Sequence, residues 1–366
     1  MSKIPASLDI INAFFTISYI PFLLPKMLYG TGFNAELLWT TICTLIAVCS
    51  IIATYFSQRA LIAGPSIAAI AVLMDRVYPS INSNSELAAI ILTTSVLLAL
   101  SAQFNLHNKL LRILSNKTKI GFKAGIGLMF LITSLSMVHA SNTLLFFALF
   151  SVFIILRNYS FIPPLICIAT TIALNLETSS AIHQLKPMLF MPSWHNSLIA
   201  SIIVLYSTML IDTTITANTL NPGKEHKGLN LTAVFSGISS CSTLLPCSMY
   251  LETLILPNKN DIKAAYYCAF IFMLFGILGR NLFIPDYLAA ALLASLGIKI
   301  FISTKPQIWL RKSPQAIIVA LFVGLIKSFL IAITAGIALD TIKNKLTLEN
   351  TIWLIMLTFV IVLVHH

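Results

Sequence analysis

Long apolar runs recur along almost the whole chain and constrain its fold more than any other feature. Runs of about 17 to 25 residues, the length a helix needs to cross about 30 Å of hydrocarbon, follow one another from near residue 9 with only short polar links between them. Because 58% of the residues are hydrophobic and only 10% are charged, a water-soluble domain could not cover its surface with polar groups. The sequence therefore predicts an all-α polytopic membrane protein.

About fourteen transmembrane segments are predicted. The first run follows a single Lys3 and continues into further spans, so we interpret it as a retained helix rather than a cleavable signal. The last run reaches almost to His366, so no soluble C-terminal domain is expected. We place the spans at 9–30, 36–56, 60–76, 86–104, 118–138, 142–157, 159–176, 196–218, 227–245, 246–257, 261–284, 285–303, 313–341 and 349–365.

The basic residues divide unevenly between the two sides of this arrangement. With the N-terminus inside, sixteen of the 23 Lys and Arg residues fall on the inner side and six on the outer side, while Lys327 lies within a span. The positive-inside rule then predicts that both termini are cytoplasmic, and we expect a bacterial inner (plasma) membrane. The net charge of +11 is thus assigned to topology, and no nucleic-acid partner is expected.

A polar interruption at 177–195 divides the chain into two halves. Residues 1–176 form a predicted first repeat of seven spans, and residues 196–366 form a second repeat of seven. An odd number of spans in each half makes the halves oppositely oriented, which is the inverted-repeat plan of many secondary transporters.

Two short, proline-interrupted segments occupy the third span of each half. One contains Gly64, Pro65 and Ser66, and the other contains Pro246 and Ser248. Proline fits the first turn of a helix, so each segment is predicted to run as extended chain into a short helix. Two such helix N-termini facing one another near the midplane would present N–H groups to a substrate. A pair of ordinary proline kinks is the alternative.

Two carboxylates, Asp212 and Glu252, fall inside apolar stretches of the second half. A charge at bilayer depth costs roughly 2.5 kcal/mol or more and usually marks a substrate, ion or proton site. Burial disfavours the charged form of a carboxyl group, so both acids are candidate proton carriers. We predict that they face the crevice between the broken segments with Ser66, Ser248 and Tyr250. The alternatives are that Asp212 lies near solvent at a helix end, or that each acid only bonds neighbouring hydroxyls.

Other polar and small residues carry structural expectations. Acids at span edges, which include Asp75 and Asp340, are expected to be solvated, and Lys327 is expected to reach the interface along its stem. Gly125 and Gly127 are expected to let helices approach closely. The six cysteines lack metal-type spacing and are expected to be packing residues. No metal site, cofactor or enzymatic activity is predicted.

Several motifs together resemble the nucleobase permeases, especially the AzgA-like purine permeases and the nucleobase–ascorbate transporter family. The carrying stretches are 14–25, Leu210-Ile211-Asp212-Thr213 and Ser248-Met249-Tyr250-Leu251-Glu252-Thr253. The resemblance implies a core subdomain from spans 1–4 and 8–11 beside a gate subdomain from spans 5–7 and 12–14. It also implies an elevator-like movement and proton-coupled uptake of a purine or pyrimidine base, with sodium as the alternative coupling ion.

Other stretches resemble the sulfate permease family, which shares this fold. They are 59–66, with its Gly-Pro entry, 119–128, and Leu244-Leu245-Pro246. That resemblance implies transport of an inorganic anion such as sulfate or bicarbonate. We rank it second because the C-terminal cytoplasmic domain of that family is not expected here. In addition, the basic residue expected in the tenth span is replaced by Glu252 or Thr253, and an unprotonated acid would repel an anion. The expected partners are a small-molecule substrate and the lipid bilayer. The protein could also form a homodimer. A membrane enzyme or a non-transporting scaffold is the alternative from a different functional class.

Overall fold

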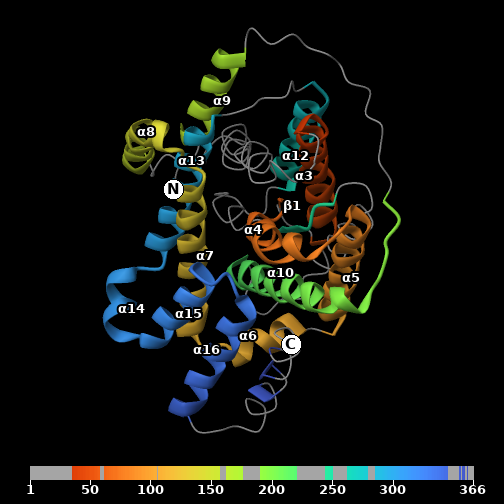
Figure 1. Ribbon diagram of the computed structural model, residues 1–366, viewed down its shortest axis with the longest axis vertical. Coiled ribbons are helices and arrows are strands. Elements are labelled where there is room, and N and C mark those ends of the chain that lie inside the picture. Colours follow the sequence, from red (N-terminus) through yellow and green to blue (C-terminus); the bar gives the residue numbers. More distant parts are fainter. Residues whose placement is uncertain are drawn as a thin grey trace.

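The computed structural model describes residues 35–57, 62–104, 106–156, 162–175, 190–220, 244–249, 262–278 and 285–344, together with five positions between 354 and 361. Its main elements are helical (Figure 1). In chain order they are α3 (Ala35–Ser57), β1 (Ala63–Pro65), α4 (Ile67–Val72), η1 (Leu73–Val77), η2 (Tyr78–Ser80), α5 (Asn84–Gln103), α6 (Leu106–Ile113), α7 (Asn116–Ser136), η3 (Ala140–Asn142), α8 (Thr143–Ile155), α9 (Ile162–Asn175), η5 (Asn196–Leu198), α10 (Ile199–Leu220), β2 (Cys247–Met249), α12 (Ile262–Leu278), α13 (Asp286–Ser303), α14 (Pro306–Lys312), α15 (Pro314–Gly324) and α16 (Phe329–Asn344).

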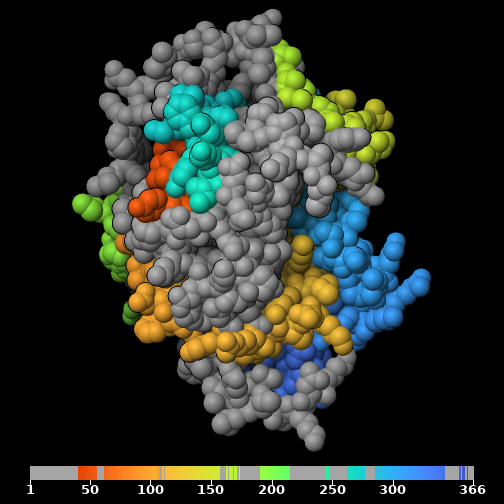
Figure 2. Space-filling model, turned by 180° about the vertical axis from the view of Figure 1, so that it is seen from behind, coloured from red at the N-terminus to blue at the C-terminus, as the bar shows by residue number. Residues whose placement is uncertain are grey.

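One group of elements, called here the first group, surrounds the two short strands. It comprises α3, α4, η1, α5, α10 and α12 with β1 and β2. Helix α12 packs along α3, and α10 packs against both α5 and α4 (Figure 1). From behind, α3 and α12 lie side by side on one flank of the molecule (Figure 2). The strands are therefore enclosed by helices far apart in the sequence.

The second group is built on α7, which packs against both α13 and α15, with α8, α9, α14 and α16 around them. Glycines allow the close contacts. A Cβ atom added at Gly127 would lie 2.7 Å from the carbonyl oxygen of Gly297, and one added at Gly125 would lie 2.5 Å from Cβ of Val323. The expectation that Gly125 and Gly127 permit close helix packing is confirmed.

Four described helical stretches are both long and apolar enough to cross a bilayer: Asn84–Gln103, Asn116–Ser136, Asn196–Thr214 and Asp286–Ser303. Shorter apolar helices accompany them at Thr40–Tyr55, Ala140–Ile155, Ile262–Gly276, Pro314–Gly324 and Phe329–Ile342. The protein is an integral membrane protein with a helical fold. The prediction of about fourteen spans in two inverted repeats includes 9–30 and most of 227–245, which lie outside the described residues, so that count stays a prediction.

One predicted span is wrong in its boundaries. The sequence stretch 313–341 was assigned to a single span, whereas the structure divides it into α15, which ends at Gly324, and α16, which begins at Phe329. The backbone between them turns through Lys327, whose φ of 53° lies in the left-handed region. A non-glycine residue in that region cannot continue a right-handed helix, so the apolar run is interrupted there.

Candidate functional site at the broken segments

The two proline-interrupted segments meet as a two-stranded antiparallel sheet. Strand β1 pairs with β2 in the register Ala63 to Met249, Gly64 to Ser248 and Pro65 to Cys247. One further backbone bond extends the pairing, because Ser66 N donates to the carbonyl oxygen of Pro246 at 2.9 Å. Backbone N–H and C=O groups within a membrane must find hydrogen-bond partners inside the protein. The pairing of β1 with β2 supplies such partners for two segments that are not helical.

Helix α3 supports the first strand from behind. The Ser50 hydroxyl accepts a hydrogen bond from Ala63 N at 3.1 Å and lies 3.2 Å from the carbonyl oxygen of Ala63, to which it donates. Ser50 is buried, so both polar groups of Ala63 are paired away from solvent. On the other strand, Leu244 has a φ of 54°, which turns the chain just before Pro246. The extended geometry of both segments is thus fixed by specific contacts.

Ser66 joins the first segment to α10. Its hydroxyl accepts from Ala69 N at 3.1 Å and so caps the start of α4, which continues into η1. The same hydroxyl donates to Asp212 Oδ2 at 2.9 Å. Asp212 is 7% exposed and lies well inside α10, eight residues before its end at Leu220. This hydrogen bond joins the start of α4 to an acidic side chain buried within α10.

The structure brings most of the predicted site residues together. Gly64, Pro65 and Ser66 lie on one side of the strand pair, and Pro246 and the backbone of Ser248 lie on the other, while Asp212 is bonded to Ser66. Asp212 is not at a solvent-exposed helix end. Tyr250 and Glu252 lie outside the described residues, so their places in the site stay predictions.

Two features near other helix ends were missed from the sequence. Asp340, expected to be solvated, is 7% exposed and accepts from the Thr118 hydroxyl at 3.2 Å. Gln315 Nε2 donates to the same hydroxyl at 2.8 Å and to the carbonyl oxygen of Gly336 at 3.0 Å. The starts of α7 and α15 converge here on α16. The apolar sequence around Asp340 and around Gln315 does not indicate that these two helix starts meet α16.

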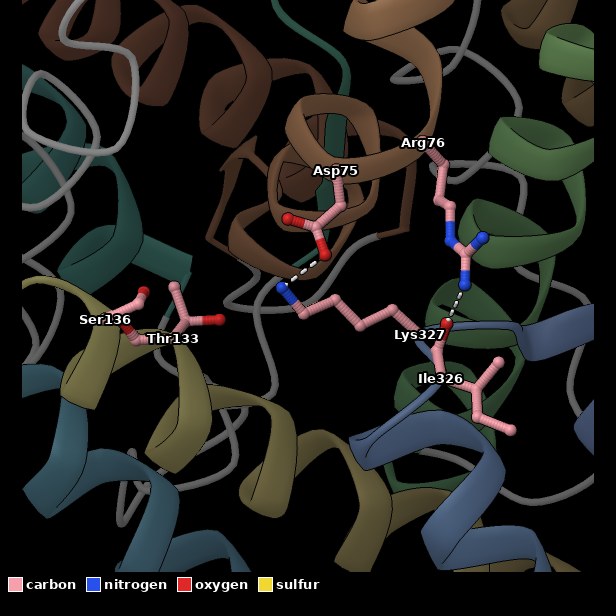
Figure 3. A network of polar contacts seen from close by, with 6 residues as sticks. All are labelled: Asp75, Arg76, Thr133, Ser136, Ile326 and Lys327. Atoms are coloured by element: carbon pink, nitrogen blue, oxygen red, sulfur yellow. Dashed lines mark hydrogen bonds and ion pairs between the residues drawn. The ribbon is translucent and has the colours of Figure 1, made fainter.

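Lys327 has a partner that the sequence did not predict. Its ammonium lies 2.5 Å from Asp75 Oδ2, on η1 of the first group (Figure 3). No three His, Cys, Asp or Glu side chains gather into a metal site within the described ranges. All five cysteines that the structure describes are buried, as expected for packing residues.

No protein-family model matches this chain, and no curated protein matches it. Solved structures do. The transmembrane domain of a cyanobacterium bicarbonate transporter, BicA, matches with a TM-score of 0.62 and 15% identity over 92% of this chain and 98% of that one. SLC26A9 matches with a TM-score of 0.58 and 13% identity over 91% of this chain, which spans 64% of its length. A murine SLC26A9 anion transporter in the inward-facing state gives 0.47 at 13% identity, over 93% and 68% of the two chains.

These similarities agree with the second of the two family resemblances and not with the first. BicA is a bicarbonate transporter, and bicarbonate is one of the anions that the second resemblance implies. The match to BicA extends over nearly the full length of both chains. At 13 to 15% identity such matches establish a shared architecture, not a shared substrate. The chain has the fold of a membrane-transporter domain of this kind.

Proposed function

We propose that the protein is a secondary transporter that carries a small inorganic anion of the bicarbonate or sulfate type together with a cation. The observation that carries this proposal is the junction of β1, β2 and α10, where Ser66 caps α4 and donates to the buried Asp212. We prefer an anion to a nucleobase as the substrate because this chain shares its fold, over 92% of its length, with a bicarbonate transporter.

Helix ends at bilayer depth can hold an anion without any basic side chain. Strand β1 leads directly into α4, and the N–H groups of its first turn carry partial positive charge. Ser66 occupies one of them through its cap with Ala69 N. We place the anion beside this helix start and beside the end of β2, which Tyr250 and Glu252 follow in the sequence.

Asp212 supplies the reason for coupling. Two negative charges a few ångströms apart in a medium of low polarity repel each other strongly, and a cation that enters with the anion would remove that repulsion. We assign that role to a proton on Asp212, with sodium as the alternative ion and with Glu252 as a second proton carrier. Anion and cation then enter and leave together, which is symport.

The rest of the proposal concerns the roles of the two groups, the topology in the membrane and the partners of the protein. The first group would act as the moving core and the second group as the gate, with about fourteen spans arranged as two inverted repeats of residues 1–176 and 196–366. Both termini would be cytoplasmic in a bacterial inner membrane. The protein would be no enzyme, would bind no nucleic acid or cofactor, and would function as a monomer or homodimer.

Uptake into proteoliposomes tests the proposal. Labelled bicarbonate, sulfate, uracil and xanthine are offered separately at mildly alkaline pH, with an imposed proton gradient, with an imposed sodium gradient and with neither. We expect uptake of one of the anions, accelerated by one of the gradients. Uptake of uracil or xanthine without uptake of either anion would overturn the anion assignment in favour of the nucleobase resemblance.

A further inference from the structure

A pair of contacts joins the first group to the second at the break between α15 and α16. Lys327 Nζ lies 2.5 Å from Asp75 Oδ2, and Arg76 Nη2 donates to the carbonyl oxygen of Ile326 at 2.7 Å. Asp75 and Arg76 are neighbours on η1, and Ile326 and Lys327 are neighbours on the link that follows α15 (Figure 3). Two adjacent residues of one group therefore hold two adjacent residues of the other.

The backbone on both sides of this contact departs from regular α-helix. Residues Leu73–Val77 form a π-helical turn, and Lys327 has a φ of 53°. π-helical turns within helices are frequent at functional sites, and a non-glycine residue with positive φ costs free energy that the surrounding structure must offset. The Lys327 side chain is only 13% exposed, so its ammonium is partly desolvated and depends on the Asp75 carboxylate.

Two polar residues of the second group are drawn together with these contacts in Figure 3. Thr133 and Ser136 lie on α7, and Figure 3 shows the Thr133 hydroxyl pointing toward the side on which the Lys327 ammonium lies. That hydroxyl is buried and has no hydrogen-bond partner among the residues that the structure describes. A buried hydroxyl without a partner is costly, so a state of the protein in which water reached Thr133 would gain a hydrogen bond.

We propose that Asp75–Lys327 and Arg76–Ile326 form a latch that closes one side of the boundary between the two groups and is broken when that side opens. The inference rests on the proposed function, since a latch has meaning only if the groups move against each other. Asp75 lies at the far end of the α4–η1 helix from Ser66, so the latch is separated from the Ser66–Asp212 site by the length of that helix. In the predicted topology the latch lies toward the outer side of the membrane.

A latch of this kind shifts a conformational equilibrium rather than forming the site. An ion pair of about 1 kcal/mol shifts the ratio of closed to open molecules about fivefold. Opening exposes the surface of α7 that faces Lys327, including Thr133. The accessibility of position 133 therefore reports the latch without any measurement of transport.

The test measures the rate at which a membrane-impermeant thiosulfonate modifies Thr133→Cys in the full-length protein, in right-side-out vesicles, after subtracting the rate for the protein that lacks this cysteine. We expect Asp75→Asn and Lys327→Gln each to raise the rate about fivefold. The exchanged pair Asp75→Lys with Lys327→Asp is expected to return it toward the starting value. Glu86→Gln, which removes a negative charge from the nearby start of α5, should leave the rate unchanged.

Equal labelling rates in the parent, Asp75→Asn and Lys327→Gln proteins would overturn the latch, as would an exchanged pair that labels as fast as the single variants. Both results are independent of substrate, so a latch that fails while anion uptake persists leaves the proposed function standing. Conversely, a labelling response in a protein that transports no anion supports the latch and refutes the substrate assignment. Size-exclusion profiles confirm that each variant is folded before labelling.

Discussion

The Ser66 hydroxyl donates to the Asp212 carboxylate at 2.9 Å across 146 positions of sequence. This bond connects the end of β1 to the interior of α10, and it uses the same hydroxyl that caps α4. One side chain thereby sets the start of a helix and the position of a buried acid. A change at Ser66 is expected to affect both the stability of the protein and its activity.

Ser66→Ala removes the cap and the donor together. Loss of a helix cap costs about 1 kcal/mol, and a buried carboxylate without its donor costs about 1 to 3 kcal/mol more. We expect a lower thermal midpoint and a fall of roughly tenfold in the initial rate of uptake. Ser66→Thr keeps the hydroxyl and should retain most of the uptake.

Ser83→Ala is the matched control, because Ser83 caps α5 by accepting from Glu86 N and takes no part in the site. It should lower the thermal midpoint slightly and leave uptake intact. Equal loss of uptake in Ser83→Ala and Ser66→Ala would show that the effect of Ser66 is only one of stability.

The amide of Gln315 is expected to stabilise the second group. Its nitrogen donates to the Thr118 hydroxyl and to the carbonyl oxygen of Gly336, and Thr118 in turn donates to Asp340. Gln315→Glu replaces this donor by an acceptor and places a second acid near Asp340. We expect a loss of about 1 to 3 kcal/mol in the free energy of unfolding, measured by denaturation in detergent.

Gln315→Met is the comparison, since it keeps the length of the side chain without adding a charge. It should be less destabilising than Gln315→Glu at neutral pH. If Gln315→Glu is as stable as the parent protein, the hydrogen bonds of the amide nitrogen do not contribute as the structure implies.

The contact between Gly127 and Gly297 leaves no room for a side chain. A Cβ atom at Gly297 would lie 2.6 Å from the carbonyl oxygen of Gly127. Gly297→Ala must therefore separate α7 from α13, at a cost of about 1 to 3 kcal/mol. Thermal unfolding in detergent checks this, with Leu135→Ala, an exposed position on α7, as the control that should change little.

Much of the candidate site could be predicted from the sequence because single residues in short stretches indicated it. Pro65 and Pro246 marked the two segments at which the structure has extended chain, and Asp212 stood out as an acid within an apolar run. The pairing register was not predictable, since strands of three residues have too little alternation to specify it. The bond from Ser66 to Asp212 depends on packing between distant helices, which no local pattern encodes.

Other misses have the same origin. The run 313–341 has no proline after Pro314, so little in the sequence indicates that the helix is interrupted at Lys327. Asp340 was expected in solvent because it lies near a span end, but the starts of α7 and α15 cover it. Both errors follow from treating each span alone, when the environment of a charge is set by neighbouring helices.

The proposed coupling of anion transport to a cation by Asp212 is tested with Asp212→Asn. Asparagine keeps the size of the side chain and can still accept from Ser66, but it cannot gain or lose a proton and carries no charge. Initial rates of bicarbonate and sulfate uptake into proteoliposomes are measured with and without the driving gradient, with Glu86→Gln as the control. We expect that the gradient no longer accelerates uptake in Asp212→Asn, while Glu86→Gln behaves as the parent protein. Gradient-driven uptake that persists unchanged in Asp212→Asn would contradict this coupling.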